Sequence, residues 1–141
     1  MLYIYFMSIN QKKIWITGAS SGIGKSLALK FAKENWLVAI SARRKELLDE
    51  IAQNKNILSF PMDVTDANLV ETTFSNILDK FIDLDLCVFC SGAYDPKLEK
   101  EINKEQIKKI MNVNFFGVLN CIKTVEDYFK KKKKGNISIV S

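Results

Sequence analysis

Three glycines, Gly18, Gly22 and Gly24, stand between a stretch with strand character and a stretch with helix character. Residues 12–17 form an apolar, β-branched run, and from Ile23 onward apolar residues recur on one face of a helix. At the start of a helix, unpaired backbone N–H groups and the helix dipole attract an anion. Glycine lets a phosphate approach the backbone closely and permits a positive φ. The stretch therefore predicts a phosphate-binding turn.

The residues from Thr17 to Gly24, Thr-Gly-Ala-Ser-Ser-Gly-Ile-Gly, resemble the TGxxxGIG motif of the short-chain dehydrogenase/reductase family. The resemblance extends over nearly all 141 residues. It implies a Rossmann sheet that binds NAD(P) and an activity that moves hydride to or from that cofactor. It also implies which residues hold the pyrophosphate and the ribose, namely Gly18, Ser20, Ser21, Gly22, Ile23 and Gly24.

A competing motif overlaps the same turn. Gly24-Lys25-Ser26 matches the end of a P-loop, whose form is G-x-x-x-x-G-K-[ST]. The first glycine of a P-loop would have to stand where the chain has Ala19, and Gly18 lies one position too far away. Because the lysine of a P-loop must reach the β- and γ-phosphates from a fixed turn, the sequence disfavours a nucleoside triphosphatase.

Two arginines follow the second apolar run, residues 36–41. In a dinucleotide-binding fold this point meets the adenine ribose, and an acidic residue there would repel a 2′-phosphate. The chain has Ser41 and Ala42, followed by Arg43, whose guanidinium matches a phosphate. We therefore expect NADP(H) in preference to NAD(H), with Arg43 on the 2′-phosphate and Arg44 as a second contact. The alternative is that both arginines only begin a surface helix.

Asp63 and Gly92 follow the next two apolar runs, residues 57–60 and 86–90. In the resembled family, an aspartate placed like Asp63 and the next backbone N–H, here that of Val64, hold the adenine ring. The alternative for Asp63 is a turn residue that hydrogen-bonds its own backbone. The family usually has Asn-Asn-Ala-Gly after the fourth strand. Only Gly92 of those four residues is present, and the resemblance places it beside the inner ribose.

The resemblance implies one residue of the proton relay, Asn114, within the stretch Asn-Val-Asn-Phe-Phe-Gly. In the family this asparagine kinks a helix and holds a water, and the alternative is a partly exposed helix asparagine. The family's catalytic tyrosine and lysine would follow the last strand, beyond Ser141. Tyr128 and Lys132 satisfy Y-x-x-x-K, but they precede that strand, so we interpret this match as accidental.

Apolar runs that alternate with amphipathic stretches predict an α/β fold, and the resemblance implies a three-layer, Rossmann-type, doubly wound parallel sheet with strand order 3-2-1-4-5. The predicted strands are residues 12–17, 36–41, 57–60, 86–90 and 135–141. The predicted helices are residues 23–35, one capped by Asp66, and a long one that Asn103 and Gln106 cap and that runs to the lysines at 130–134. Residues 1–141 would form a single, incomplete NAD(P)-binding domain, truncated after the fifth strand. We expect such a chain to turn over little substrate and to form homo-oligomers or aggregates through the open sheet edge.

Composition excludes several other classes. The net charge of +5 comes from Lys130–Lys134, which supply five of the 21 basic residues, so nucleic-acid binding is not expected. The absence of histidine excludes His-based triads, and Cys87 and Cys90 would point to opposite faces of a strand, so no metal site is expected. Three cysteines without a signal peptide predict a cytoplasmic protein. The apolar residues 1–7 are too short to span a membrane, and either extend the first strand or precede a start at Met7.

The function predicted from these residues is an NADP(H)-dependent oxidoreductase of the short-chain dehydrogenase/reductase type. Its substrate in the full-length enzyme would be a small-molecule carbonyl or alcohol. The alternative is a non-catalytic dinucleotide-binding module, either a sensor or a partner subunit.

Overall fold

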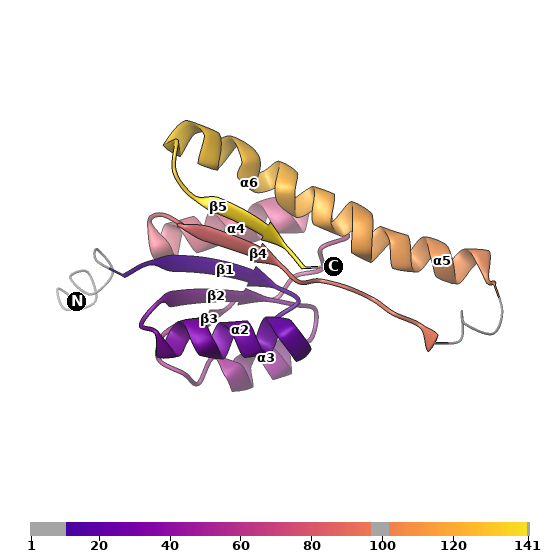
Figure 1. Cartoon of the computed structure of the whole chain (residues 1–141), viewed down its shortest axis with the longest axis horizontal. Coiled ribbons are helices and arrows are strands. Elements are labelled where there is room, and N and C mark those ends of the chain that lie inside the picture. Colours follow the sequence, from indigo (N-terminus) through magenta and orange to yellow (C-terminus); the bar gives the residue numbers. More distant parts are fainter. Residues whose placement is uncertain (1–10, 97–101, 141) are drawn as a thin grey trace.

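The computed structural model describes residues 11–96 and 102–140, and its centre is one parallel sheet of five strands in the order β3-β2-β1-β4-β5 (Figure 1). The strands are β1 (Lys13–Thr17), β2 (Leu37–Ser41), β3 (Ile57–Ser59), β4 (Leu86–Phe89) and β5 (Asn136–Ile139). The helices are α2 (Gly22–Lys33), α3 (Lys45–Ile51), α4 (Ala67–Phe81), α5 (Lys104–Met111), the π-helix η2 (Asn112–Gly117) and α6 (Val118–Lys132). The predicted α/β architecture and strand order are confirmed. Residues 1–7 and Ser141 lie outside the described residues.

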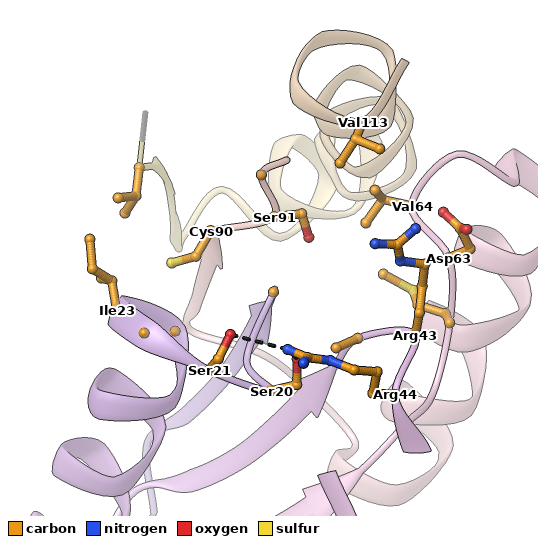
Figure 2. A pocket seen from close by; sticks show the side chains of 17 residues that line it. Ser20, Ser21, Ile23, Arg43, Arg44, Asp63, Val64, Cys90, Ser91 and Val113 are labelled. Carbon is orange, nitrogen blue, oxygen red and sulfur yellow. Dashed lines mark hydrogen bonds between the residues drawn. The ribbon is translucent and has the colours of Figure 1, made fainter. Parts of the chain in front are cut away.

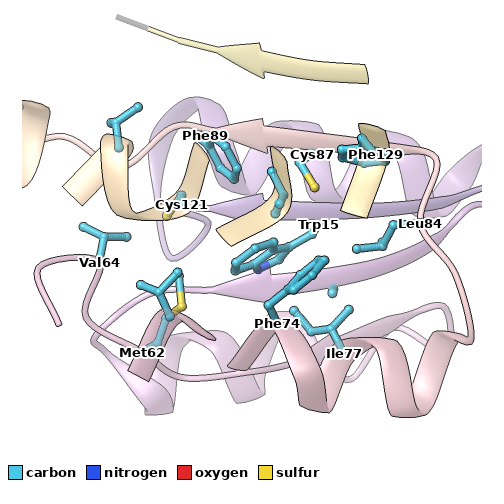
Figure 3. Close-up of a cluster of buried hydrophobic side chains, with 14 of the residues drawn as sticks. Trp15, Met62, Val64, Phe74, Ile77, Leu84, Cys87, Phe89, Cys121 and Phe129 are labelled. Carbon is cyan, nitrogen blue, oxygen red and sulfur yellow. The ribbon is translucent and has the colours of Figure 1, made fainter. Parts of the chain in front are cut away.

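Alternating residues of the central strand separate two apolar cores. Ile14 and Ile16 point to the face covered by α2 and α3, where Ala28 and Leu48 join them. Trp15 points to the other face, between α4 and α6 (Figure 3). There its ring stacks on Phe74 with the centroids 5.7 Å apart, and its indole N–H donates to the buried hydroxyl of Ser41 over 2.9 Å. The inner strands β1 and β2 are therefore buried on both sides, as their continuous apolar runs predict, whereas all four residues of the edge strand β5 are exposed.

The cysteines of the C-x-x-C stretch lie on opposite faces of the sheet. Cys87 belongs to the core beside Trp15, whereas Cys90 packs against the core beside Ile14. All three cysteines are free thiols, and burial raises the pKa of Cys121 to about 12. Within residues 11–96 and 102–140, no group of three or more His, Cys, Asp or Glu side chains could hold a metal ion. None of the helices in this part of the chain has the length and apolar character of a membrane span.

The long helix predicted from Asn103 to the lysine run is three segments, α5, η2 and α6. Asn103 caps it as predicted, since its Oδ1 accepts from the backbone N–H groups of Glu105 and Gln106, each at 3.0 Å. The sequence did not predict the π-helix itself. In addition, α5 buries none of its residues, and the apolar side chains of Ile107 and Met111 stay exposed.

Tyr128 and Lys132 have structural roles at the amino end of β4. The Tyr128 hydroxyl accepts from the backbone N–H of Leu84 over 2.9 Å, and Lys132 Nζ donates to the carbonyl of the same residue. The Tyr128 ring also packs edge-on against Phe74. These contacts agree with the interpretation of the Y-x-x-x-K match as accidental.

Asp83 pairs with two lysines just before β4. Lys13, only 5% exposed, and Lys132 both donate to its carboxylate. Burial alone would raise the pKa of Asp83, but the hydrogen bonds and charges of the lysines outweigh it and lower that pKa below its ordinary value of 3.8. A lowered folded-state pKa adds stability above the ordinary value, and this stability is lost as the pH falls through the folded-state pKa.

Replacing Asp83 is therefore expected to destabilise the fold in a pH-dependent way. Near pH 7, Asp83→Asn should lower the free energy of unfolding by about 1 kcal/mol, because the carboxyl is partly exposed and its pairs are screened by solvent. The difference in the free energy of unfolding should shrink as the pH falls below 3.8, and it should vanish once Asp83 is protonated in the folded state. The exposed Asp79 on α4 provides the control, since Asp79→Asn makes the same charge change. A destabilisation that persists unchanged in acid would contradict the ion-pair explanation.

Candidate functional site

A cavity of about 330 Å³ lies where the strands reach their carboxyl ends (Figure 2). The eleven residues predicted to contact a dinucleotide all line it: Gly18, Ser20, Ser21, Gly22, Ile23, Gly24, Arg43, Arg44, Asp63, Val64 and Gly92. The sequence interpretation missed its other lining residues: Ala42, Met62, Cys90, Ser91, Val113 and Val140. Backbone hydrogen bonds beyond the strand ends hold these loops together, for example Ala19 N–H to Ser41 O and Met62 N–H to Ala42 O.

Two glycines let backbone segments cross closely beneath the cavity. Gly18 has φ +67°, and a Cβ on it would lie 2.5 Å from the carbonyl oxygen of Cys90. A Cβ on Gly24 would lie 2.5 Å from the carbonyl oxygen of Gly18. Both close neighbours are backbone atoms, which cannot move aside as a flexible side chain can. The turn therefore needs glycine at both positions.

The N-terminus of α2 lies at this cavity, and it has neither an acidic side chain in its first turn nor a side-chain cap. Ser21 is the N-cap residue, but its side chain makes no capping hydrogen bond, and the first turn carries no acidic residue. The first backbone N–H groups of a helix have no partner within the helix, and here they belong to Gly22, Ile23 and Gly24. These groups and the helix dipole make this end of the cavity suited to an anion.

Two guanidinium groups lie at the same cavity. Arg44 Nη2 donates to the hydroxyls of Ser20, over 3.0 Å, and Ser21, over 3.2 Å, so that it lies across the glycine turn (Figure 2). Arg43 extends on the side of Asp63 (Figure 2). The sequence position favours Arg43 as the leading contact, whereas the hydrogen bonds to the glycine turn come from Arg44. The spacing of the residues could not have predicted these bonds.

Asp63 closes its own turn and also lines the cavity. Its Oδ1 accepts from the backbone N–H of Thr65 over 2.9 Å and from the Thr65 hydroxyl over 2.8 Å. The turn role named as the alternative for Asp63 is therefore present. Both bonds use Oδ1, and within the described part of the chain Oδ2 forms no hydrogen bond, so the carboxylate keeps an acceptor for a ligand.

Asn114 lies in η2 and outside the residues that line the cavity. Its Oδ1 accepts from the backbone N–H of Ala93 over 2.6 Å, and its Nδ2 donates to the carbonyl of Ala93 over 2.9 Å. The asparagine thus fastens the segment after β4, which carries Ser91 and Gly92, to η2. Asn114 is exposed, as the alternative interpretation has it, but its side-chain oxygen and nitrogen are both hydrogen-bonded.

A family model described as short chain dehydrogenase matches residues 12–141. Dehydrogenase/reductase SDR family member 7 of Mus musculus is 31% identical over 137 residues, which cover 91% of this chain and 40% of that protein. The 3-oxoacyl-[acyl-carrier-protein] reductase FabG of Thermotoga maritima is 31% identical over 140 residues, which cover 96% of this chain and 57% of that protein.

Solved structures with bound nicotinamide cofactors share the fold. ElxO with NADP bound matches with a TM-score of 0.83 and 30% identity, over 93% of this chain and 55% of that one. The 3-ketoacyl-(acyl-carrier-protein) reductase from Brucella melitensis complexed with NADH matches with a TM-score of 0.85 and 28% identity, over 92% of this chain and 56% of that one. The chain thus spans about half the length of the relatives that it matches.

Proposed function

The chain belongs to the short-chain dehydrogenase family, and we propose that it forms the cofactor-binding part of an NADP(H)-dependent oxidoreductase that acts on a small-molecule carbonyl or alcohol. The bound nicotinamide would supply or accept the hydride. The observation that carries this proposal is the single cavity in which the glycine turn, the N-terminus of α2 and two arginines converge. The three free thiols suit a cytoplasmic location, which is part of the proposal.

Each part of the cavity has a proposed role that follows from its chemistry. The N–H groups of the glycine turn and the hydroxyls of Ser20 and Ser21 would hold the pyrophosphate and ribose. Arg43 and Arg44 would hold the 2′-phosphate, since two guanidiniums favour that dianion and the end of β2 carries Ser41 and Ala42 in place of an acidic residue. The remaining proposed roles are adenine for Asp63 and Val64, the inner ribose for Gly92, and the proton relay for Asn114.

Direct titration tests the cofactor preference. When the purified 141-residue chain is titrated with NADPH and with NADH, we expect NADPH to bind at least about ten-fold more tightly, because a charge-assisted hydrogen bond is worth about 1.5–3 kcal/mol. Equal affinities would contradict the NADP(H) preference. Failure of both nucleotides to bind would contradict the dinucleotide site itself.

The second candidate function is a non-catalytic dinucleotide-binding module. One observation favours it: within the described residues, the Y-x-x-x-K pair Tyr128 and Lys132 is bound at the amino end of β4, away from the cavity. The coding sequence past codon 141, read in all three frames, separates the two candidates. A tyrosine followed four residues later by a lysine there supports the enzyme, and the lack of such a pair supports the module.

A further inference from the structure

A second asparagine on the same helical segment holds another loop that lines the cavity, the loop after β3. Asn120, in α6, donates from Nδ2 to the carbonyl oxygen of Val64 over 2.9 Å. Asn114, six positions earlier, is bonded to Ala93 after β4. One continuous segment therefore reaches the loop after β3 with one asparagine and the segment after β4 with the other.

Close packing supports the bond to Val64. Gly117 is buried where η2 passes into α6, and a Cβ on it would lie 2.5 Å from Cγ2 of Val64. The backbone of the helix thus lies directly against the Val64 side chain, while Asn120 binds its carbonyl. Val64 itself is only 6% exposed. The position of Val64 is therefore determined from both its side chain and its backbone.

The bond from Asn120 is transmitted to Asp63 through one peptide group. The carbonyl of Val64 and the N–H of Thr65 belong to the same planar peptide. Asn120 binds the oxygen of this peptide, and its N–H donates to Asp63 Oδ1 over 2.9 Å. Hydrogen bonds in such a chain polarise and orient one another. Asn120 thus orients the peptide group that binds the Asp63 carboxylate, although Asn120 itself does not line the cavity.

We propose that Asn120 is a positioning residue for adenine recognition, an inference that rests on the proposed function. A carboxylate oxygen only accepts hydrogen bonds, so Asp63 can accept from the exocyclic amino group of adenine but not pair with the carbonyl oxygen that replaces it in hypoxanthine. Discrimination between NADPH and its hypoxanthine analogue therefore depends on the orientation of Asp63. That orientation depends in turn on Asn120.

The test measures the dissociation constants of NADPH and of its hypoxanthine analogue for the 141-residue chain. The wild type should prefer NADPH by about ten-fold. Asn120→Asp keeps the size of the side chain, removes the donor and places an anion against the Val64 carbonyl. This variant should lose about ten-fold in NADPH affinity and little affinity for the analogue, so that the preference falls towards one. Asn120→Ala should give the same fall without an added charge.

Asn56→Asp is the matched control, because Asn56 Nδ2 also donates to a backbone carbonyl, that of Ala32, over 3.1 Å, away from the cavity. It should leave the preference unchanged. An Asn120 variant that is folded by circular dichroism and keeps the wild-type preference would overturn the inference, as would equal losses for both nucleotides or a wild type without any preference. If the wild type binds neither nucleotide, the proposed function fails first and the inference with it.

Discussion

Gly24→Ala is expected to weaken NADPH binding by at least about 100-fold, although it adds a single methyl group. The added Cβ would lie 2.5 Å from the carbonyl oxygen of Gly18 and 2.9 Å from its carbonyl carbon. Real Cβ atoms do not approach backbone this closely, so either Gly18 or the start of α2 must move. Either movement redirects the N–H groups that are proposed to meet the pyrophosphate, and hydrogen bonds to an anion weaken steeply when misaligned.

A loss of affinity must be separated from a loss of folding, and Gly135 allows this. Gly135 has φ +120°, and a Cβ on it would overlap the Phe129 ring between α6 and β5, outside the cavity lining. Gly135→Ala should therefore destabilise the protein by about 1–3 kcal/mol while the folded fraction keeps its affinity for NADPH. Urea unfolding and calorimetric titration of both variants measure the two effects. If Gly24→Ala keeps the wild-type affinity for NADPH, the proposed binding of the pyrophosphate by the glycine turn is contradicted.

The strands, the helices and the caps at Asp66 and Asn103 could be predicted because they depend on local patterns, whereas the strand order was predicted from the family resemblance. Apolar runs alternating with amphipathic stretches indicate parallel strands joined by helices, and the sheet has the predicted order. Asp66 was predicted to cap the next helix, and its Oδ1 accepts from the backbone N–H of Leu69 over 3.0 Å. A cap is recognisable in a sequence because the donor and the acceptor are only three positions apart.

The π-helix could not be predicted because distant contacts determine it. Asn112–Gly117 contains no local signal that separates a π-turn from an α-turn. The segment has to present Asn114 to Ala93, 21 positions earlier, and Gly117 to Val64. The bonds of Arg44 to Ser20 and Ser21 have the same origin, since they join residues 24 and 23 positions apart. The types of the residues that line the cavity were predictable, whereas the bonds that orient them depend on the tertiary structure.

The two arginines are expected to differ in which nucleotides they affect. Arg43→Ala should weaken NADPH binding by about 10- to 100-fold and leave NADH binding within about three-fold, because only NADPH carries the 2′-phosphate that a guanidinium would bind. Arg44 also holds Ser20 and Ser21 of the turn that would bind both nucleotides. Arg44→Ala should therefore weaken NADPH binding by a similar factor and NADH binding by a smaller but measurable factor. The double variant should bind the two nucleotides with nearly equal affinity.

Fluorescence titration of each variant with NADPH and NADH, at low and at high salt, measures these differences. The preference of the wild type for NADPH over NADH should shrink as salt increases, because ions screen the exposed guanidiniums. In the double variant this preference should depend little on salt. Lys45→Ala is the control, since Lys45 is an adjacent exposed cation that pairs with Asp49 and does not line the cavity. The loss of one positive charge there should change the preference for NADPH by less than about two-fold. If Arg43→Ala weakens the binding of NADH as much as the binding of NADPH, Arg43 does not bind the 2′-phosphate.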